Sequence, residues 1–206
     1  MQKAAVGFRV HSGWTALVVV SVEKGLPVVL SRQRLNLVKI FSYKFRQPFH
    51  TAEKLPFANA DKFISSVRTD AEQLACSALR AVKEQLKKQR YQLDRASLLL
   101  ASGKALPDLE KILQSHALIH TADGELFRQV LHLACKRCGL ELACARERDL
   151  LELCAQAFSI PAPELQRRVA QLGRSVGSPW SQDEKFAALA AWLAITTNGR
   201  DLAAKH

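Results

Sequence analysis

The sequence lacks the long apolar segment that a membrane-spanning helix requires. No apolar run approaches the roughly 20 residues needed to cross a bilayer, and the longest, residues 14–22, is interrupted by Thr15 and Ser21. A secretory signal is also missing, because no small-residue cleavage site follows an apolar stretch of signal length near the N-terminus. We therefore expect a cytoplasmic protein with no membrane partner.

Acidic side chains are scarce at the N-terminal end. The 206 residues carry 30 basic and 19 acidic side chains, a net charge of +11, and residues 1–60 hold nine of the basic but only two of the acidic ones. This segment has a net charge of +7, whereas residues 101–206, with 13 basic and 12 acidic side chains, are nearly balanced. A one-sided positive field attracts polyanions such as nucleic acid, although a basic surface also serves solubility alone.

The cysteine content argues against a disulfide scaffold, since five is an odd number and no signal peptide is present. Cys135 and Cys138 form a CxxC pair, and Cys144 and Cys154 could add thiolates, but the spacing differs from that of paired zinc knuckles. At the end of an amphipathic helix such a pair is typical of core packing, and a thioredoxin-like role would need a helix N-terminus. We predict no metal centre, while metal binding by these four cysteines is left open.

Other motifs of catalytic chemistry are missing as well. The chain has no phosphate-binding glycine loop of the GxxxxGK[ST] or GxGxxG type, and the adjacent His11 and Ser12 diverge on an extended segment, so they form no nucleophile–base pair. We expect a helix to end between His116 and His120, so that these histidines, like His132, belong to the core or the surface. We therefore predict no cofactor, no metal ligand and no catalytic residue.

What the sequence does contain is a regular succession of strands and helices. Three strands are predicted at residues 6–10, 14–22 and 28–38, followed by irregular chain over 40–57 and a long amphipathic helix over 58–89. The remaining elements are a strand at 95–103 that ends at Gly103, helices at 107–116 and 123–138, a strand at 140–145, helices at 147–158 and 163–173, and a last helix with a capping box at 181–184 and a stop at Gly199. A meander followed by alternating strands and helices implies an α/β protein with a mixed sheet covered by helices. We expect one domain over residues 1–206, with 147–206 as a helical part packed on it.

Four short stretches carry a more specific pattern. They are the strand–turn–strand at residues 7–20, the middle strand at 96–103, the helix and following Gly-Leu-Glu-Leu at 126–142, and the acidic start of an alanine-rich helix at 183–190. In this order the stretches resemble the RuvC-type Holliday junction resolvases of the ribonuclease H-like group. The resemblance implies a ribonuclease H-like mixed sheet, in which an antiparallel three-stranded meander is joined by parallel strands and flanked by helices.

The resemblance also implies a nuclease site that this sequence does not complete. Such enzymes hold two divalent metals with carboxylates from the first strand, the middle strand and the last helix. Here Arg9 replaces the first acid, the middle strand has none, and only Asp183 and Glu184 remain, in a first helical turn where acids are typical of capping. A cationic Arg9 would repel a metal ion, so we expect a degenerate domain, a pseudoenzyme in which this nuclease chemistry is missing.

Residues 31–50 are the most informative segment for function. If residues 41–46 are extended, Phe41, Tyr43 and Phe45 share one face, with Lys44 and Arg46 on the other. Cations contact phosphates and exposed rings stack on unpaired bases, whereas the alternative is a strand with its aromatic rings in the core. The predicted nucleic-acid-binding residues are Arg9, Arg32, Arg34, Lys39, Tyr43, Lys44, Phe45 and Arg46.

These observations together predict non-catalytic binding of nucleic acid or of a ribonucleoprotein through a basic N-terminal sheet. Two alternatives belong to other classes of function. One is a protein-interaction module with a protein partner and no nucleic acid, and the other is a divergent enzyme of unrecognised chemistry.

Overall fold

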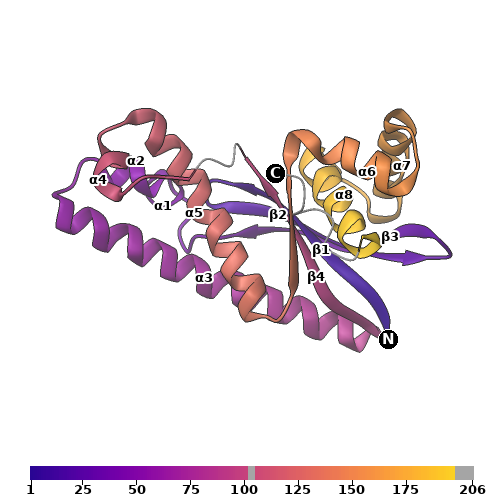
Figure 1. Ribbon diagram of the computed structural model, residues 1–206. Coiled ribbons are helices and arrows are strands. Elements are labelled where there is room, and N and C mark those ends of the chain that lie inside the picture. Colours follow the sequence, from indigo (N-terminus) through magenta and orange to yellow (C-terminus); the bar gives the residue numbers. More distant parts are fainter. Residues whose placement is uncertain (102–104, 198–206) are drawn as a thin grey trace.

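The computed structural model describes residues 1–101 and 105–197, which build a five-stranded sheet with helices on both of its faces (Figure 1). The strands are β1 (Gln2–His11), β2 (Trp14–Glu23), β3 (Leu26–Asn36), β4 (Tyr91–Leu100) and β5 (Glu141–Arg146). The helices are α1 (Tyr43–Arg46), α2 (Pro48–Ala52), α3 (Phe57–Lys88), α4 (Leu109–Leu113), α5 (His116–Arg137), the 3₁₀ turn η1 (Glu147–Asp149), α6 (Leu150–Phe158), α7 (Ala162–Val176) and α8 (Gln182–Thr196). None of the helices in this described part combines the length and apolar character that crossing a bilayer requires.

The sheet is mixed, with the strand order β3-β2-β1-β4-β5. β2 pairs antiparallel with both β1 and β3, whereas β4 pairs parallel with both β1 and β5. The carboxyl ends of β1, β4 and β5 therefore lie at the same edge of the sheet. The predicted α/β class, with a three-stranded meander joined by parallel strands, is confirmed.

Side chains alternate between two cores, one on each face of the sheet. Phe8 of β1 and Leu17 of β2 pack with α3 and α5, while Ala16 and Val18 of β2 pack with α6, α7 and α8. A strand covered on both faces needs apolar residues at successive positions rather than at alternate ones. This explains the nearly continuous apolar run of β2.

Helix α8 lies unusually close to the sheet. A Cβ atom added to Gly7 of β1 would stand 1.9 Å from the carbonyl oxygen of Ala187 and 2.7 Å from the backbone nitrogen of Ala191. Small side chains on both partners permit this approach, and every residue from 187 to 194 is buried, as its apolar sequence predicted. The close packing fixes the start of α8 over the carboxyl end of β1.

Several predicted boundaries differ from the structure: β1 and β4 each begin four residues before the predicted start, and β4 ends at Leu100. Two further errors affect the sites described below. Residues 40–57, expected to be irregular, contain the helices α1 and α2. Helix α5 begins at His116 instead of residue 123, because Ile119, Ala122 and Leu126 continue one buried stripe of helical spacing against the core. The predicted stops at Gly103 and Gly199 lie outside the described residues.

Candidate nucleic-acid interface

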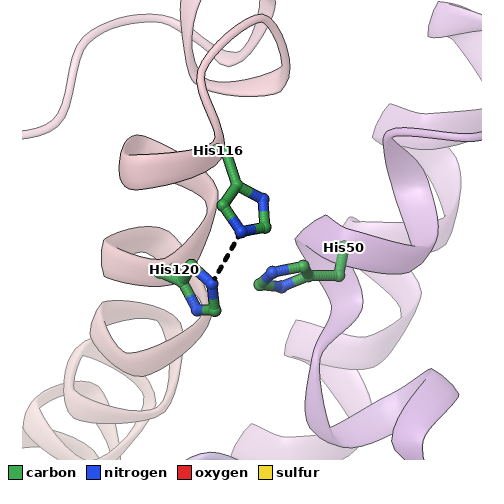
Figure 2. A group of neighbouring side chains, drawn as sticks. All are labelled: His50, His116 and His120. Carbon is green, nitrogen blue, oxygen red and sulfur yellow. Dashed lines mark hydrogen bonds between the residues drawn. The ribbon is translucent and has the colours of Figure 1, made fainter.

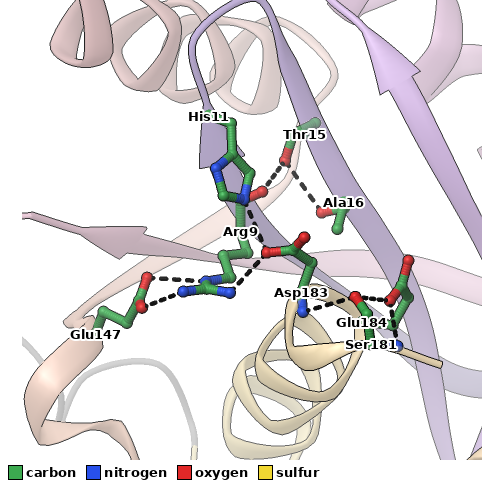
Figure 3. Close-up of polar contacts among 8 residues, drawn as sticks. All are labelled: Arg9, His11, Thr15, Ala16, Glu147, Ser181, Asp183 and Glu184. Carbon is green, nitrogen blue, oxygen red and sulfur yellow. Dashed lines mark hydrogen bonds and ion pairs between the residues drawn. The ribbon is translucent and has the colours of Figure 1, made fainter.

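Four polar side chains gather at the edge where β1, β4 and β5 end (Figure 3). Arg9 of β1 donates from Nε and Nη2 to the two carboxylate oxygens of Glu147, at 3.1 and 2.6 Å, and from Nη1 to Oδ1 of Asp183 at 2.6 Å. The Nε2 atom of His11 lies 2.8 Å from the same oxygen of Asp183. We refer to Arg9, His11, Glu147 and Asp183 as the acid–arginine cluster.

Local structure brings these residues together from three elements. Arg9 follows Gly7 at the strand period of two, so it faces α8, and Glu147 is the first residue after β5. Asp183 lies in the first turn of α8, which a capping box holds in place: the Ser181 hydroxyl accepts the backbone N–H of Asp183, and the Glu184 carboxylate accepts that of Ser181. Glu184 thus has the capping role expected of both acids, whereas the carboxylate of Asp183 is directed at Arg9 and His11.

The acids of this cluster form ion pairs with a cation of the same chain. Hydrogen bonding to Glu147 raises the pKa of the Arg9 guanidinium above its ordinary value, against the opposing effect of burial, and Asp183 adds to the rise. The Arg9 side chain is 19% exposed, so the ion pairs are only partly screened by water. One guanidinium thus pairs with both carboxylates, and Arg9, Glu147 and Asp183 together keep a net charge of −1.

This donor set does not fit a pair of divalent metals. A guanidinium lies between the only two carboxylates of the cluster, and within the described residues neither acid joins His11 in a group of three that could share an ion. Sequence reasoning identified Arg9 and Asp183 but missed Glu147. Its position directly after a strand parallel to β1 was the signal that could have revealed it.

An open pocket of about 480 Å³ borders the cluster. Its lining includes Glu147, Phe186 of α8 and two arginines, Arg146 and Arg148. The guanidinium of Arg9 lies 5.0 Å from the centre of the Phe186 ring. The edge of the sheet thus combines a hollow with basic side chains on its rim.

A second group of side chains continues from His11 along the edge of the sheet. The His11 ring stacks on the Trp14 ring, with 4.4 Å between the ring centroids. The guanidinium of Arg34 also packs on the Trp14 ring, 3.8 Å from its centroid. Phe41 then lies 5.1 Å from the guanidinium of Arg34 and 4.5 Å from that of Arg46. We call His11, Trp14, Arg34, Phe41 and Arg46 the cation–aromatic stack.

The last member of the stack, Arg46, packs against the β1–β2 turn. Gly13 has a positive φ of 83°, and a Cβ atom there would meet the side chain of Arg46 at 2.6 Å. Arg46 also donates from Nε to the carbonyl oxygen of Ser12 at 3.2 Å. The glycine thus supplies both the turn conformation and the space that Arg46 occupies.

The extended alternative for residues 41–46 is wrong, because Tyr43–Arg46 forms the helical turn α1. A helical turn places neighbouring residues on different sides, so the aromatic residues do not share one face. Phe45 turns toward the core and lies 6.0 Å from Phe63, with Lys44 beside both rings. Tyr43 and Phe41 remain 59% and 42% exposed.

Two other predicted basic residues are engaged within the protein. The guanidinium of Arg32 donates to the carbonyl oxygens of Val176, Ser178 and Pro179, and so ties β3 to the end of α7. Lys39 lies 2.7 Å from Asp70 on the surface of α3. Of the predicted basic residues, Arg34 and Arg46 are thus brought together in the stack, whereas Arg9, Arg32 and Lys39 are not.

The four cysteines considered as thiolate ligands do not meet at one place. Cys135 lies in the core beneath α5 and Cys154 in the core on the opposite face of the sheet. Burial raises the pKa of each of these thiols to about 12, which keeps them protonated. Cys138 stands at the C-terminal end of α5, with its thiol 3.8 Å from the carbonyl oxygen of Cys76.

The expected separation of His116 and His120 is also wrong. Because α5 begins at His116, the two side chains stand one helical turn apart, with their Nε2 atoms 3.1 Å from each other. The fold adds His50 of α2 to this pair. No sequence spacing could have indicated the third histidine, since it comes from a helix that the sequence did not predict.

The architecture places the chain in the ribonuclease H-like class of α/β folds. RuvC of Thermus thermophilus has the same fold, with 12% sequence identity and a TM-score of 0.50 over 94% of this chain and 93% of that chain. T. thermophilus RuvC in complex with a Holliday junction substrate gives 11% identity and a TM-score of 0.51 over the same shares of the two chains. No family model and no curated protein sequence matches this chain.

Proposed function

We propose that this protein binds nucleic acid at the cation–aromatic stack, without the two-metal cleavage chemistry that its fold can support. The observation that carries the proposal is the stack itself, in which two guanidinium groups alternate with aromatic rings at the surface. A guanidinium stacked on a ring keeps its N–H groups free at the edge, where they suit phosphate oxygens. An exposed ring such as that of Phe41 offers a face on which an unpaired base stacks.

The electrostatics of the neighbouring edge support binding rather than cleavage. Arg9 offsets part of the negative charge of the two acids of the acid–arginine cluster, so they repel a phosphate backbone less than free carboxylates would. Within the described residues, Arg9 and Arg32 donate from several guanidinium nitrogens to partners in the protein, whereas Arg46 donates from Nε to Ser12. The proposal therefore assigns phosphate contacts to Arg34, to the terminal nitrogens of Arg46 and to the exposed Lys44. Segment 1–60, which holds most of the excess positive charge, supplies all three.

Binding of the full chain to fluorescent ligands at several salt concentrations tests this proposal. The ligands are duplex, four-way-junction and single-stranded DNA and the corresponding RNAs; the junction is included because the structurally similar RuvC has been solved with a Holliday junction substrate. We expect measurable binding at low salt and a steep decrease in affinity as salt rises. Binding that is absent at low salt, or insensitive to salt, would contradict the proposal.

A double substitution locates the phosphate contacts. Replacing Arg34 and Arg46 by glutamine should lower the slope of log affinity against log salt by about 2. The matched control replaces Lys87 and Lys88, two exposed residues at the end of α3, by glutamine, which changes the net charge by the same amount. Equal losses in both variants would show that general charge, and not the stack, determines affinity.

A second pair of variants tests base stacking. Phe41→Ala should weaken binding to single strands by roughly 1–3 kcal/mol and leave duplex binding unchanged. Phe57→Ala removes a ring that is more exposed, 55% against 42% for Phe41, at the start of α3, and serves as the control. A Phe41→Ala variant with undiminished single-strand affinity would remove stacking from the proposal.

A further inference from the structure

Three imidazole rings converge between α2 and α5 (Figure 2). The ring centroid of His50 lies 5.4 Å from that of His116 and 4.3 Å from that of His120, and the last two are 4.5 Å apart. One ligand atom from each ring can be chosen so that all three lie within 4.8 Å of one another. We call His50, His116 and His120 the histidine cluster.

The spacing of these atoms is close to that of a metal site. Two nitrogen atoms bound to one tetrahedral zinc ion, with Zn–N bonds of about 2.0–2.1 Å, lie roughly 3.4 Å apart. The Nε2 atoms of His116 and His120 are 3.1 Å apart in a hydrogen bond, so a shift of a few tenths of an ångström admits an ion in place of the shared hydrogen. Histidines four residues apart on one helix face are a common zinc-binding pair.

The buried carboxylate of Asp123 orients the third ring, that of His50, through a hydrogen bond to Nδ1. Nδ1 of His50 lies 2.5 Å from Oδ2 of Asp123, and the other oxygen of Asp123 accepts the backbone N–H of Phe49 at 2.7 Å. Asp123 is only 2% exposed, so this arrangement is fixed by the fold. A carboxylate that accepts the Nδ1 proton leaves the Nε2 lone pair of His50 free, and metal-binding histidines commonly donate their other ring N–H to a carboxylate in this way.

From this geometry we propose that the histidine cluster binds one divalent transition-metal ion of the zinc class. Three imidazole nitrogens are a donor set suited to Zn²⁺, Co²⁺, Ni²⁺ or Cu²⁺ rather than to Mg²⁺ or Ca²⁺, which prefer oxygen ligands. His116 and His120 are exposed, so the ion reaches the site from solvent and keeps a fourth position for water or another ligand. The ion joins α2 to the start of α5, and this proposal is independent of nucleic-acid binding.

Metal titration of the full chain, stripped with a chelator and kept reduced, tests the proposal. Zn²⁺ binding is followed by calorimetry, and Co²⁺ binding by absorption, because a four-coordinate nitrogen site gives visible d–d bands without the near-ultraviolet band of a thiolate ligand. We expect one ion per chain at micromolar concentrations. An absence of binding in this range, or a Co²⁺ spectrum dominated by thiolate, would overturn the proposal.

Variants separate the histidine cluster from the other donors of the chain. A His116→Ala, His120→Ala double variant changes two exposed side chains and should abolish stoichiometric binding while the chain stays folded. His132→Ala, which removes another exposed histidine of α5, is the matched control and should bind as the wild type does. Binding that survives the double variant would place the ion elsewhere and contradict the proposal.

Asp123 is expected to act as a positioning residue. In Asp123→Asn an amide N–H faces Nδ1 of His50 once the amide oxygen accepts the N–H of Phe49, so the ring must carry its proton on Nε2, where the ion would bind. We expect the affinity for Zn²⁺ to fall by about 10- to 100-fold, with the stoichiometry unchanged and the ¹⁵N shifts of the ring showing the exchanged tautomer. An unchanged affinity would remove this role from Asp123.

Discussion

Both the acid–arginine cluster and the histidine cluster have a carboxylate beside a histidine, Asp183 at His11 and Asp123 at His50, but these carboxylates differ in what else they contact. In the acid–arginine cluster, Glu147 and Asp183 meet the permanent positive charge of Arg9. Behind the histidine cluster, the carboxylate of Asp123 accepts from His50 and from the backbone N–H of Phe49, and burial raises the pKa of this carboxyl despite both contacts. In the first arrangement a cation of the chain itself lies between the carboxylates, whereas the second brings one ligand atom from each of three imidazole rings within 4.8 Å of the others.

The helices α8 and α5, which carry residues of the two clusters, differ in how their first turns are held in place. Helix α8 begins with a capping box and packs against β1 without an intervening side chain at Gly7. The N-cap residue of α5, Ser115, makes no side-chain capping hydrogen bond, and the first residue of the helix, His116, is exposed. The acid–arginine cluster therefore lies at a capped helix start that packs closely on the sheet, whereas the histidine cluster lies at a helix start without a side-chain cap.

The largest expected effect comes from separating α8 from the sheet. Gly7→Ala forces a methyl group against the backbone of Ala187, and we expect a loss of about 3 kcal/mol or more in the free energy of unfolding. The histidine cluster lies on helices that pack on the other face, so Co²⁺ binding by the folded variant should be unchanged. Urea unfolding and Co²⁺ titration measure the two effects.

The control for this variant is Gly124→Ala in α5. There the added methyl group meets only the flexible end of Arg128, and alanine is the better helix former by about 1 kcal/mol. We expect a neutral or stabilising change. A Gly7→Ala protein as stable as the wild type would mean that α8 and β1 are not in backbone contact.

We expect an intermediate effect on the free energy of unfolding when the acid–arginine cluster loses Arg9. Arg9→Ala leaves Asp183 and Glu147 without their partner, and because these ion pairs are partly buried, we expect a loss of about 1–2 kcal/mol in the free energy of unfolding. The exposed pair of Arg167 with Glu164 is the comparison, and Arg167→Ala should cost at most about 0.5 kcal/mol. Similar losses in both variants, measured by urea unfolding, would show that the cluster adds nothing beyond a surface ion pair.

The same variant separates two roles of Arg9. The sequence predicted a phosphate contact for this residue, whereas its guanidinium is fully engaged with two carboxylates. We therefore expect folded Arg9→Ala to keep the slope of log affinity against log salt, because no direct phosphate contact is lost. Its affinity at low salt should fall, because the carboxylates of Glu147 and Asp183 then face the phosphate backbone without their cation. A slope lowered by about one would restore the phosphate contact.

The smallest expected effect concerns the two helix starts. Ser181→Ala removes the hydroxyl that caps α8 and should lower the free energy of unfolding by about 1 kcal/mol. Ser115→Ala at the start of α5 removes no such hydrogen bond and should change it by only a few tenths of a kcal/mol. Equal effects, from thermal or urea unfolding, would remove the contrast between the two helix starts.

Much of the fold was predictable because it follows from local patterns. The apolar run of β2, the long stripe of α3 and the capping box of α8 each determine their element with little help from the rest of the chain. The start of α5 was misplaced because polar residues and Gly124 obscured a stripe that is completed only by packing. Helices α1 and α2 are too short to show a periodic pattern.

The sites were less predictable because their members come from distant segments. Glu147 reaches Arg9 from 138 positions away, and Asp123 reaches His50 from 73 positions away. The spacing of residues along the chain does not predict such contacts, because they depend on the strand order and on where the helices pack. Sequence analysis therefore named some residues at each site, such as Arg9 with Asp183 and His116 with His120. It missed Glu147, His50 and Asp123, which complete the contacts.

One short segment belongs to both surfaces for which a ligand is proposed. Phe41 and Arg46 face the cation–aromatic stack, while His50, four residues beyond Arg46, faces α5. Two ligands that order the same stretch of backbone share the entropic cost of ordering it. By thermodynamic reciprocity, any factor by which a bound ion tightens nucleic-acid binding must equal the factor by which nucleic acid tightens the ion.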